Sequence, residues 1–191
     1  MIRVSPPNYR FCPFCRGRLE IRTEEEKEQK YCPVCQWTYY PRMAASVSAV
    51  IVRGSKTLMV KRAREPFKGT WMFPSGFVDF GEHVCDALVR EVREETGLTV
   101  TRATLLGIFQ SPDDLRELGH HVFFFLTETD DHALVTDDEE NCGIEWFDIG
   151  KPPTVGWELH KRFVAALQKG GLEDQGSNGL SYDISTVSSQ G

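Results

Sequence analysis

One predicted helix, residues 83–96, constrains the fold of this chain more than any other feature. Val84, Leu88 and Val92 are spaced four residues apart, so they share one helical face. That apolar face has to be buried against another layer of structure, most simply a sheet. Gly97 follows the helix directly and predicts a left-handed C-terminal cap.

Three glutamates lie on the same predicted helix. Glu91, Glu94 and Glu95 stand at positions i, i+3 and i+4, so they share one patch at the edge of the apolar stripe. Carboxylates in such a patch raise each other's pKa unless a cation lies among them, and hard oxygen ligands select Mg²⁺ or Mn²⁺. The alternative is a solvated acidic face. Because these glutamates border the apolar stripe instead of opposing it, the pattern favours a divalent metal site suited to phosphate chemistry.

A second constraint comes from the cysteines near the N-terminus. Cys12 and Cys15 form one CxxC pair, Cys32 and Cys35 form another, and 16 residues separate the two pairs. Each pair suits a turn that presents two thiolates, and two pairs complete a tetrahedral zinc site. Since the protein supplies all the ligands, the predicted zinc is structural and not catalytic.

The cysteine region also raises an alternative role in nucleic acid binding. Four arginines lie close to the cysteine pairs: Arg10, Arg16, Arg18 and Arg22. The Glu-rich insert at residues 24–28 opposes contact with a phosphate backbone, so we favour the structural role. Cys85 and Cys142 fall outside the ligand pattern, and we interpret them as packing residues rather than nucleophiles.

The charge balance limits the classes of partner. The chain carries 22 Lys and Arg against 28 Asp and Glu, a formal net charge of −6, so no overall basic field attracts nucleic acid or an anionic membrane. An anionic substrate would have to be held locally, through bound cations. Residues 1–8 contain no apolar run, and stretches such as residues 122–126 are too short to cross a bilayer. We therefore expect a cytoplasmic protein with a small-molecule partner and no membrane partner.

The remaining pattern divides the chain into three regions. Strands are expected over residues 46–53, 57–62, 100–109, 122–128 and 144–148, and a second helix over residues 155–169. The last residues are rich in Gly and Ser with little to bury, which predicts a flexible tail. We expect a zinc ribbon over residues 1–41, the main domain over residues 42–170 and the tail over residues 171–191.

The acidic segment resembles the Nudix box, G-x5-E-x7-R-E-U-x-E-E-x-G-U with U aliphatic, at every defined position. The matching residues are Gly76, Glu82, Arg90, Glu91, Val92, Glu94, Glu95, Gly97 and Leu98. The resemblance implies an α/β fold, the Nudix α/β/α sandwich around a mixed sheet, preceded here by the small zinc-ribbon module. It also implies a hydrolase that cuts the pyrophosphate bond of a nucleoside diphosphate linked to another moiety.

The same resemblance implies roles for individual residues. Glu91, Glu94 and Glu95 would bind the catalytic Mg²⁺ or Mn²⁺ ions, with the main-chain carbonyl of Ser75 as a further ligand. Arg90 would hold a glutamate in register through a charge-assisted hydrogen bond. The expected catalytic residues are thus Glu91, Glu94, Glu95 and Arg90, together with Glu140 as a candidate general base.

The general base remains open at this point. In some Nudix relatives it is the glutamate that matches Glu91, and in others it is a glutamate on a later loop. Glu139 and Glu140 precede the strand expected over residues 144–148 and are the later candidates here. The alternative for these two residues is an ordinary acidic turn.

A zinc ribbon directly before a Nudix domain resembles the NADH pyrophosphatase branch of the family, as does the run Tyr39–Met43. That branch carries an S-Q-P-W-P-F-P-x-S stretch after the box that reads the nicotinamide dinucleotide. The corresponding region here, Gly107–Leu115, keeps only scattered Gln, Ser and Pro. ADP-ribose and FAD therefore join NADH as candidate substrates. Trp71 and Phe109 are candidates for stacking on the base, although each type is more often a core residue.

Two rival functions compete with this hydrolase. One is a Nudix fold retained as a non-catalytic nucleotide sensor, with the ribbon as a binding module, but a degenerate box usually accompanies such a loss and this box is complete. The other is hydrolysis of oxidised nucleoside triphosphates, and the small enzymes of that kind generally lack a ribbon. Relatives with this ribbon are often dimers, so the resemblance also implies a homodimer.

Overall fold

The computed structural model describes residues 8–117, 119–130, 132–135, 140–172 and 180–182. The chain divides into two compact units, one ending at Met43 and the other beginning at Ala44. The expected boundary between ribbon and main domain lies after residue 41. Among the described residues, no helix is long and apolar enough to span a membrane.

The first unit is a small antiparallel sheet with two cysteine turns. Its strands are β1 (Glu20–Glu24), β2 (Lys27–Tyr31) and β3 (Thr38–Tyr39), in the order β1-β2-β3. The two turns have the same backbone pattern: the carbonyl of Cys12 accepts from the N–H of Arg16, and that of Cys32 accepts from the N–H of Gln36, both at 2.9 Å. Arg16 and Gln36 both have positive φ, 63° and 61°. The repeated CxxC motif therefore folds as a repeated turn.

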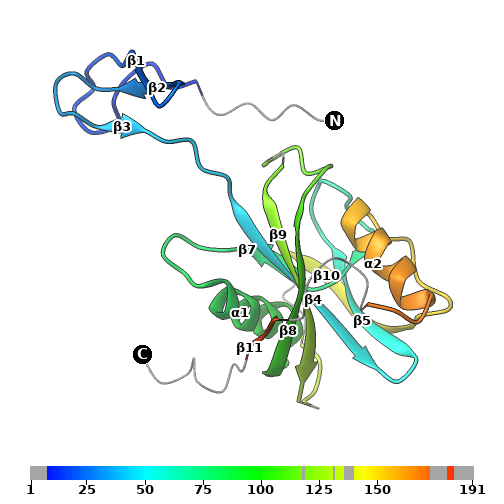
Figure 1. The fold of residues 1–191 in the computed structure, drawn as a ribbon. Helices are drawn as coiled ribbons and strands as arrows, with labels where there is room; N and C mark the ends of the chain where they lie inside the picture. Colours follow the sequence, from blue (N-terminus) through cyan, green and yellow to red (C-terminus); the bar gives the residue numbers. More distant parts are fainter. Residues whose placement is uncertain (1–7, 118, 131, 136–139, 173–179, 183–191) are drawn as a thin grey trace. The chain divides into compact units, whose positions relative to one another are not determined.

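The second unit is built on a mixed sheet with a helix on each face (Figure 1). Its strands are β4 (Ala45–Arg53), β5 (Lys56–Arg62), β6 (Trp71–Met72), β7 (Ser75–Phe77), β8 (Val100–Gln110), β9 (His121–Thr129), β10 (Asn141–Asp148) and β11 (Leu180–Tyr182). The order is β10-β5-β4-β9-β8-β11, while β6 pairs with β5 and β7 with β4. The β4–β9 pairing is parallel and the others are antiparallel, so the expected mixed sheet is confirmed.

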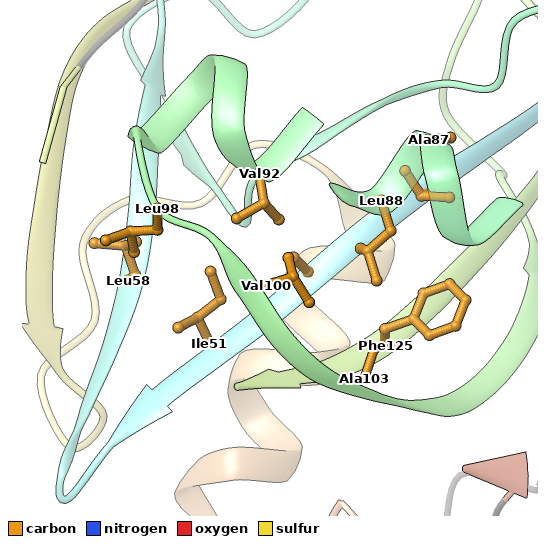
Figure 2. Close-up of a cluster of buried hydrophobic side chains, with 11 residues drawn as sticks. Ile51, Leu58, Ala87, Leu88, Val92, Leu98, Val100, Ala103 and Phe125 are labelled. Carbon is orange, nitrogen blue, oxygen red and sulfur yellow. The ribbon is translucent and has the colours of Figure 1, made fainter. Parts of the chain in front are cut away.

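The central strand β4 separates two hydrophobic cores because its side chains alternate between faces. Val47, Ala49 and Ile51 point to the helix α1 (Val84–Thr96), and Val50 points to the helix α2 (Glu158–Gln168). Figure 2 shows the first of these cores, in which apolar side chains of α1 meet those of β4, β5, β8 and β9. The apolar stripe of the acidic helix is thus buried as its spacing predicts.

Most element boundaries agree with the sequence-based prediction. The five predicted strands and the acidic helix are all present, and Gly97 has φ 74° as its left-handed cap. The second helix is shorter than predicted and begins at Glu158, not near residue 155, because Val155 forms a β-bridge with Trp71 and Trp157 is the N-cap.

The expected tail is described only in part. Residues 180–182 form β11, which pairs with β8. The rest of the predicted flexible segment, apart from residues 171–172, lies outside the described residues.

Candidate active site

Strand β7 approaches α1 so closely at Gly76 that only glycine fits there. A Cβ built on Gly76 would lie 2.0–2.2 Å from the carboxylate atoms of Glu91. The glycine therefore leaves the space that the Glu91 carboxylate occupies. Glu91 as a residue is 9% exposed, and burial raises the pKa of its carboxyl while the Arg90 guanidinium opposes that change.

Arg90 holds the acidic residues of this region in place. Its guanidinium makes a bidentate ion pair with Glu82, with both N–O distances 2.9 Å. The same group donates to Glu91 at 2.6 Å, to Glu94 at 3.2 Å and to the carbonyl of Phe77 at 3.0 Å. The hydrogen bonds from Arg90 hold the pKa of the Glu82 carboxyl below its ordinary value. Arg90 thus fixes the orientation of its neighbouring glutamates, and it ties α1 to β7.

Glu95 is the most deeply buried acid of the site. It is 3% exposed and accepts hydrogen bonds from the N–H of Ser75 at 2.7 Å and the side-chain amide of Asn141 at 2.6 Å. Burial raises its pKa to about 8, against the lowering effect of these hydrogen bonds. Burial therefore outweighs the hydrogen bonds, and a bound cation would favour the ionised form of this carboxyl.

A cleft lies over these glutamates. It has a volume of about 820 Å³, including space open to solvent, and its lining includes Glu91, Glu95, Arg90, Ser75 and Glu140. Glu94 is not among the lining residues, and its side chain is 55% exposed on the helix.

The later general-base candidates differ in what the structure shows of them. Glu140 lines the cleft, is 60% exposed and pairs with Arg64 at 3.3 Å. Glu139 lies outside the described residues. The structure therefore brings Glu140 and Glu91 to one cleft from different parts of the fold.

The cleft contains a donor set that fits a divalent cation. Buried carboxylates with raised pKa values, those of Glu91 and Glu95, favour neutralisation by a cation. The side-chain oxygen of Asn141 is buried and has no hydrogen-bond partner among the described residues, so a hydrated ion would supply the missing donor. Among the described residues the three helix glutamates do not form a tight ligand group. Arg90 binds Glu91 and Glu94, and the Ser75 N–H binds Glu95.

The predicted base-stacking residues lie elsewhere. Trp71 packs on Phe147 with ring centroids 4.6 Å apart, and Phe109 packs on Phe124 and Phe163 at 5.9 Å and 5.4 Å. Neither Trp71 nor Phe109 lines the cleft or the pocket that adjoins it. The geometry gives no support to a substrate contact for either residue.

An adjoining pocket contains residues that sequence reasoning missed. It measures about 480 Å³, including open solvent, and its lining includes Arg62, Arg116, Trp157 and Asp113. These residues come from β5, from the loop after β8 and from the segment before α2, so no local pattern connects them. Only the position of Asp113 in the sequence could have indicated this pocket. Asp113 lies in the region Gly107–Leu115, which corresponds to the dinucleotide motif of the NADH pyrophosphatase branch.

The four N-terminal cysteines form a separate cluster in the first unit. Their sulfur atoms all lie within 4.8 Å of one another, and the Cys12–Cys35 and Cys15–Cys32 pairs are 3.5 Å and 3.3 Å apart. A tetrahedral Zn–thiolate site has sulfurs about 3.8 Å apart. Within the described part of the chain, this is the one group of three or more such ligands gathered so closely. The cluster is consistent with a zinc ribbon.

Comparisons of sequence agree on one family. The NUDIX domain model matches residues 42–167. An ADP-ribose pyrophosphatase from Methanocaldococcus jannaschii is 35% identical over 127 residues, which cover 66% of this chain and 74% of that protein. An NAD-capped RNA hydrolase, NudC, from Pseudomonas aeruginosa is 32% identical over 148 residues, 76% of this chain and 50% of that protein. This chain thus spans about half the length of the NudC proteins from Pseudomonas aeruginosa that it matches.

Comparison of structures supports the same fold. A NUDIX hydrolase from Nitrosomonas europaea superimposes with a TM-score of 0.71 at 22% identity, covering 85% of this chain and 94% of that chain. The NUDIX domain of Shewanella oneidensis NrtR, solved with ADP ribose, gives a TM-score of 0.58 at 18% identity, covering 69% of this chain and 90% of that chain. At these identities the two structures show the fold alone.

Proposed function

Because the chain belongs to the Nudix family of hydrolases, we propose that it cleaves the diphosphate of a nucleoside diphosphate joined to a second group, with ADP-ribose as the leading substrate. The observation that carries the proposal is the position of the Glu91 carboxylate. It occupies the space that a Cβ would fill if residue 76 were not glycine, Arg90 holds it there, and it lines an open cleft. Packing alone does not require a buried carboxylate at such a position.

We propose Mg²⁺ or Mn²⁺ as the catalytic ion, held by Glu91, Glu94, Glu95 and the main-chain carbonyl of Ser75. Hard oxygen donors select these ions over softer metals. When bound, such an ion neutralises phosphate charge and lowers the pKa of a coordinated water. The chain's own contribution is orientation: Arg90 fixes Glu91, and the Ser75 N–H and Asn141 amide fix Glu95.

The proton of the attacking water needs an acceptor, and Glu91 and Glu140 are the two candidates. Both line the cleft. Glu91 is buried and bonded to Arg90, whereas Glu140 is mostly exposed and carries an ion pair with Arg64. Glu140→Gln removes the base but no proposed metal ligand, so it should lower kcat at an unchanged metal requirement if Glu140 is the base. An unchanged kcat in Glu140→Gln assigns the role to Glu91.

ADP-ribose is favoured over NADH for two reasons. The region Gly107–Leu115 lacks the nicotinamide-reading stretch, and the relative from Methanocaldococcus jannaschii bears the name ADP-ribose pyrophosphatase. The NudC relatives act on NAD-capped RNA by name, which keeps dinucleotides in the panel to be tested.

The test is direct incubation of the purified protein with Mg²⁺ or Mn²⁺ and each compound. The panel contains ADP-ribose, NADH, NAD⁺, FAD, diadenosine polyphosphates and nucleoside triphosphates, and chromatography separates the products. We expect ADP-ribose to yield AMP and ribose 5-phosphate, and Glu94→Gln to lose this turnover. A folded protein that binds ADP-ribose and cleaves no compound would instead establish a nucleotide sensor.

A further inference from the structure

Two arginines stand where the glutamate cleft meets the adjoining pocket. Arg62, at the end of β5, and Arg116, in the loop after β8, line both the cleft and the pocket. The two guanidinium groups lie over the same Trp157 ring, at 5.3 Å and 5.7 Å from its centroid. The two positive charges are therefore held close together at the junction.

Arg62 is hydrogen-bonded to neutral groups, and the carboxylates of Glu95, Asp114 and Glu140 act on its charge only at longer range. Its Nε donates to the carbonyl of Pro66 at 2.8 Å, and a terminal nitrogen lies 3.5 Å from the sulfur of Met72. It forms no ion pair with any residue in the described part of the chain. Burial, and then the neighbouring Arg116, lower the pKa of this half-buried guanidinium. Such a cation gains from an anion placed beside it.

Arg116 is fixed in advance of any ligand. Its Nε and one terminal nitrogen bind the two oxygens of Asp114, at 3.0 Å and 2.8 Å, and Asp114 itself is 2% exposed. The guanidinium also lies 5.6 Å from the centroid of the Phe77 ring. A rigidly held guanidinium loses little freedom when it binds a phosphate.

The pocket beyond the arginines offers a different chemistry from the cleft. Its lining includes the hydroxyl-bearing Ser111, the carboxylate of Asp113 and the ring of Trp157. Asp113 is oriented by a hydrogen bond from the backbone N–H of Glu158 at 2.8 Å. Carboxylate and hydroxyl groups match the hydroxyls of a sugar, whereas the arginines match a phosphate.

We propose that Arg62 and Arg116 form a clamp for the second phosphate of the substrate, the one that bears a ribosyl group seated in the pocket. This proposal rests on the proposed function and deepens it. The ligand is a 5-phosphoribosyl group, which both halves of ADP-ribose contain. The substrate class is then a diphosphate substituted at both ends, whose two phosphates are held by different parts of the site.

The experiment uses the full-length protein and three matched variants: Arg62→Gln, Arg116→Gln and Arg102→Gln. Arg102 is an exposed arginine on β8 that pairs with Glu128 at 3.8 Å, so it controls for the loss of a positive charge. We expect the two clamp variants to raise the KM for ADP-ribose by about 10- to 100-fold with kcat nearly unchanged. The control should match the wild type.

A second readout does not depend on turnover. Calorimetry in excess EDTA measures the Kd of AMP and of ribose 5-phosphate for the wild type and the variants. The half that binds more tightly, and loses about 10-fold or more in affinity in both clamp variants, identifies the group held in the pocket. If the protein cleaves nothing, the proposed function fails, and this readout still decides the clamp.

Folding is controlled separately, because Arg116→Gln leaves Asp114 buried without its partner. Arg116→Lys keeps the charge and should recover part of the lost affinity. The double variant Asp114→Asn, Arg116→Gln removes both charges and should bind as weakly as Arg116→Gln. The clamp is overturned if KM and Kd in both clamp variants equal those of Arg102→Gln.

Discussion

The cysteine cluster and the glutamate cleft both gather candidate metal ligands, but they are assembled in different ways. The cluster is made by two local turns, each closed by a hydrogen bond back to Cys12 or Cys32 within four residues. The cleft joins groups distant in sequence, since Glu95 is held by Ser75 and Asn141. A closed site can thus be specified locally, whereas an open site that admits a substrate depends on the whole sheet.

The largest effect is expected from breaking the closed site. Cys32→Ser removes a fully buried thiolate, and zinc binding contributes about 10–16 kcal/mol to the folding of small zinc modules. We expect loss of zinc and of ribbon structure, with the thermal transition and activity of the second unit retained. Metal analysis and circular dichroism measure this, with Cys142→Ser as the control that keeps zinc. Loss of activity along with zinc would show that the two sites are not independent.

The open site should be sensitive to a single methyl group. In Gly76→Ala the new Cβ takes the space of the Glu91 carboxylate, which has to move although Arg90 binds it. A displacement of about 1 Å costs about 100-fold in rate, so we expect at least that loss in kcat with little change in thermal stability. Gly171→Ala, where a Cβ meets open space, is the matched control. A fully active Gly76→Ala variant would remove the main support for the role of Glu91.

These two regions also differ in how far the sequence predicts them. The cysteine spacing and the acidic helix are repeated local patterns, so they could be read directly, as could the long apolar strands. The strands β1 and β2 were missed because Glu20–Glu24 and Lys27–Tyr31 are mostly polar and carry no apolar alternation. Short pieces such as β6 and β7 are formed by pairing with β5 and β4, which only the tertiary fold supplies.

The adjoining pocket could not be predicted for the same reason. Arg62 and Arg116 are separated in sequence by the whole acidic helix, and in the fold both guanidinium groups lie against the Trp157 ring. Trp71 is one of the two aromatic residues that the sequence suggests for base stacking, and it lies just before the box. In the fold Trp71 is only partly buried and packs on Phe147, whereas Trp157 lines the pocket. Proximity in sequence was a poor guide to proximity in the site.

The open site also depends on a hydrogen bond between residues distant in sequence, and low pH should weaken this bond. The N–H of Phe73, two residues before strand β7, donates to Nδ1 of the buried His160 at 3.0 Å. Burial lowers the pKa of His160 to about 3, against 6.5 unfolded, so the unfolded state binds more protons between these values. Stability is then complete above pH 6.5 and falls as pH decreases toward 3.

The loss from this histidine at pH 4.5 is roughly 2–3 kcal/mol, at about 1.36 kcal/mol per pH unit. Urea unfolding of the second unit at pH 7 and pH 4.5 measures it. His160→Gln keeps an acceptor but does not titrate, so its stability should change less between the two pH values. Equal changes in the wild type and His160→Gln would assign the acid sensitivity to other groups.

The smallest effect is expected at Trp71, and it tests whether the aromatic contact belongs to the core or to the substrate. Its ring packs on Phe147, and the Lys61 ammonium lies 5.9 Å from the ring centroid. Trp71 lines neither the cleft nor the pocket. Trp71→Phe keeps an aromatic ring but loses part of this packing, which is worth about 1 kcal/mol. We expect a small decrease in the free energy of unfolding and an unchanged KM for ADP-ribose. Trp157→Phe, in contrast, should raise the KM for ADP-ribose, because the Trp157 ring contacts both arginines of the clamp. A raised KM in Trp71→Phe with a normal Trp157→Phe would restore Trp71 as the aromatic that contacts the substrate.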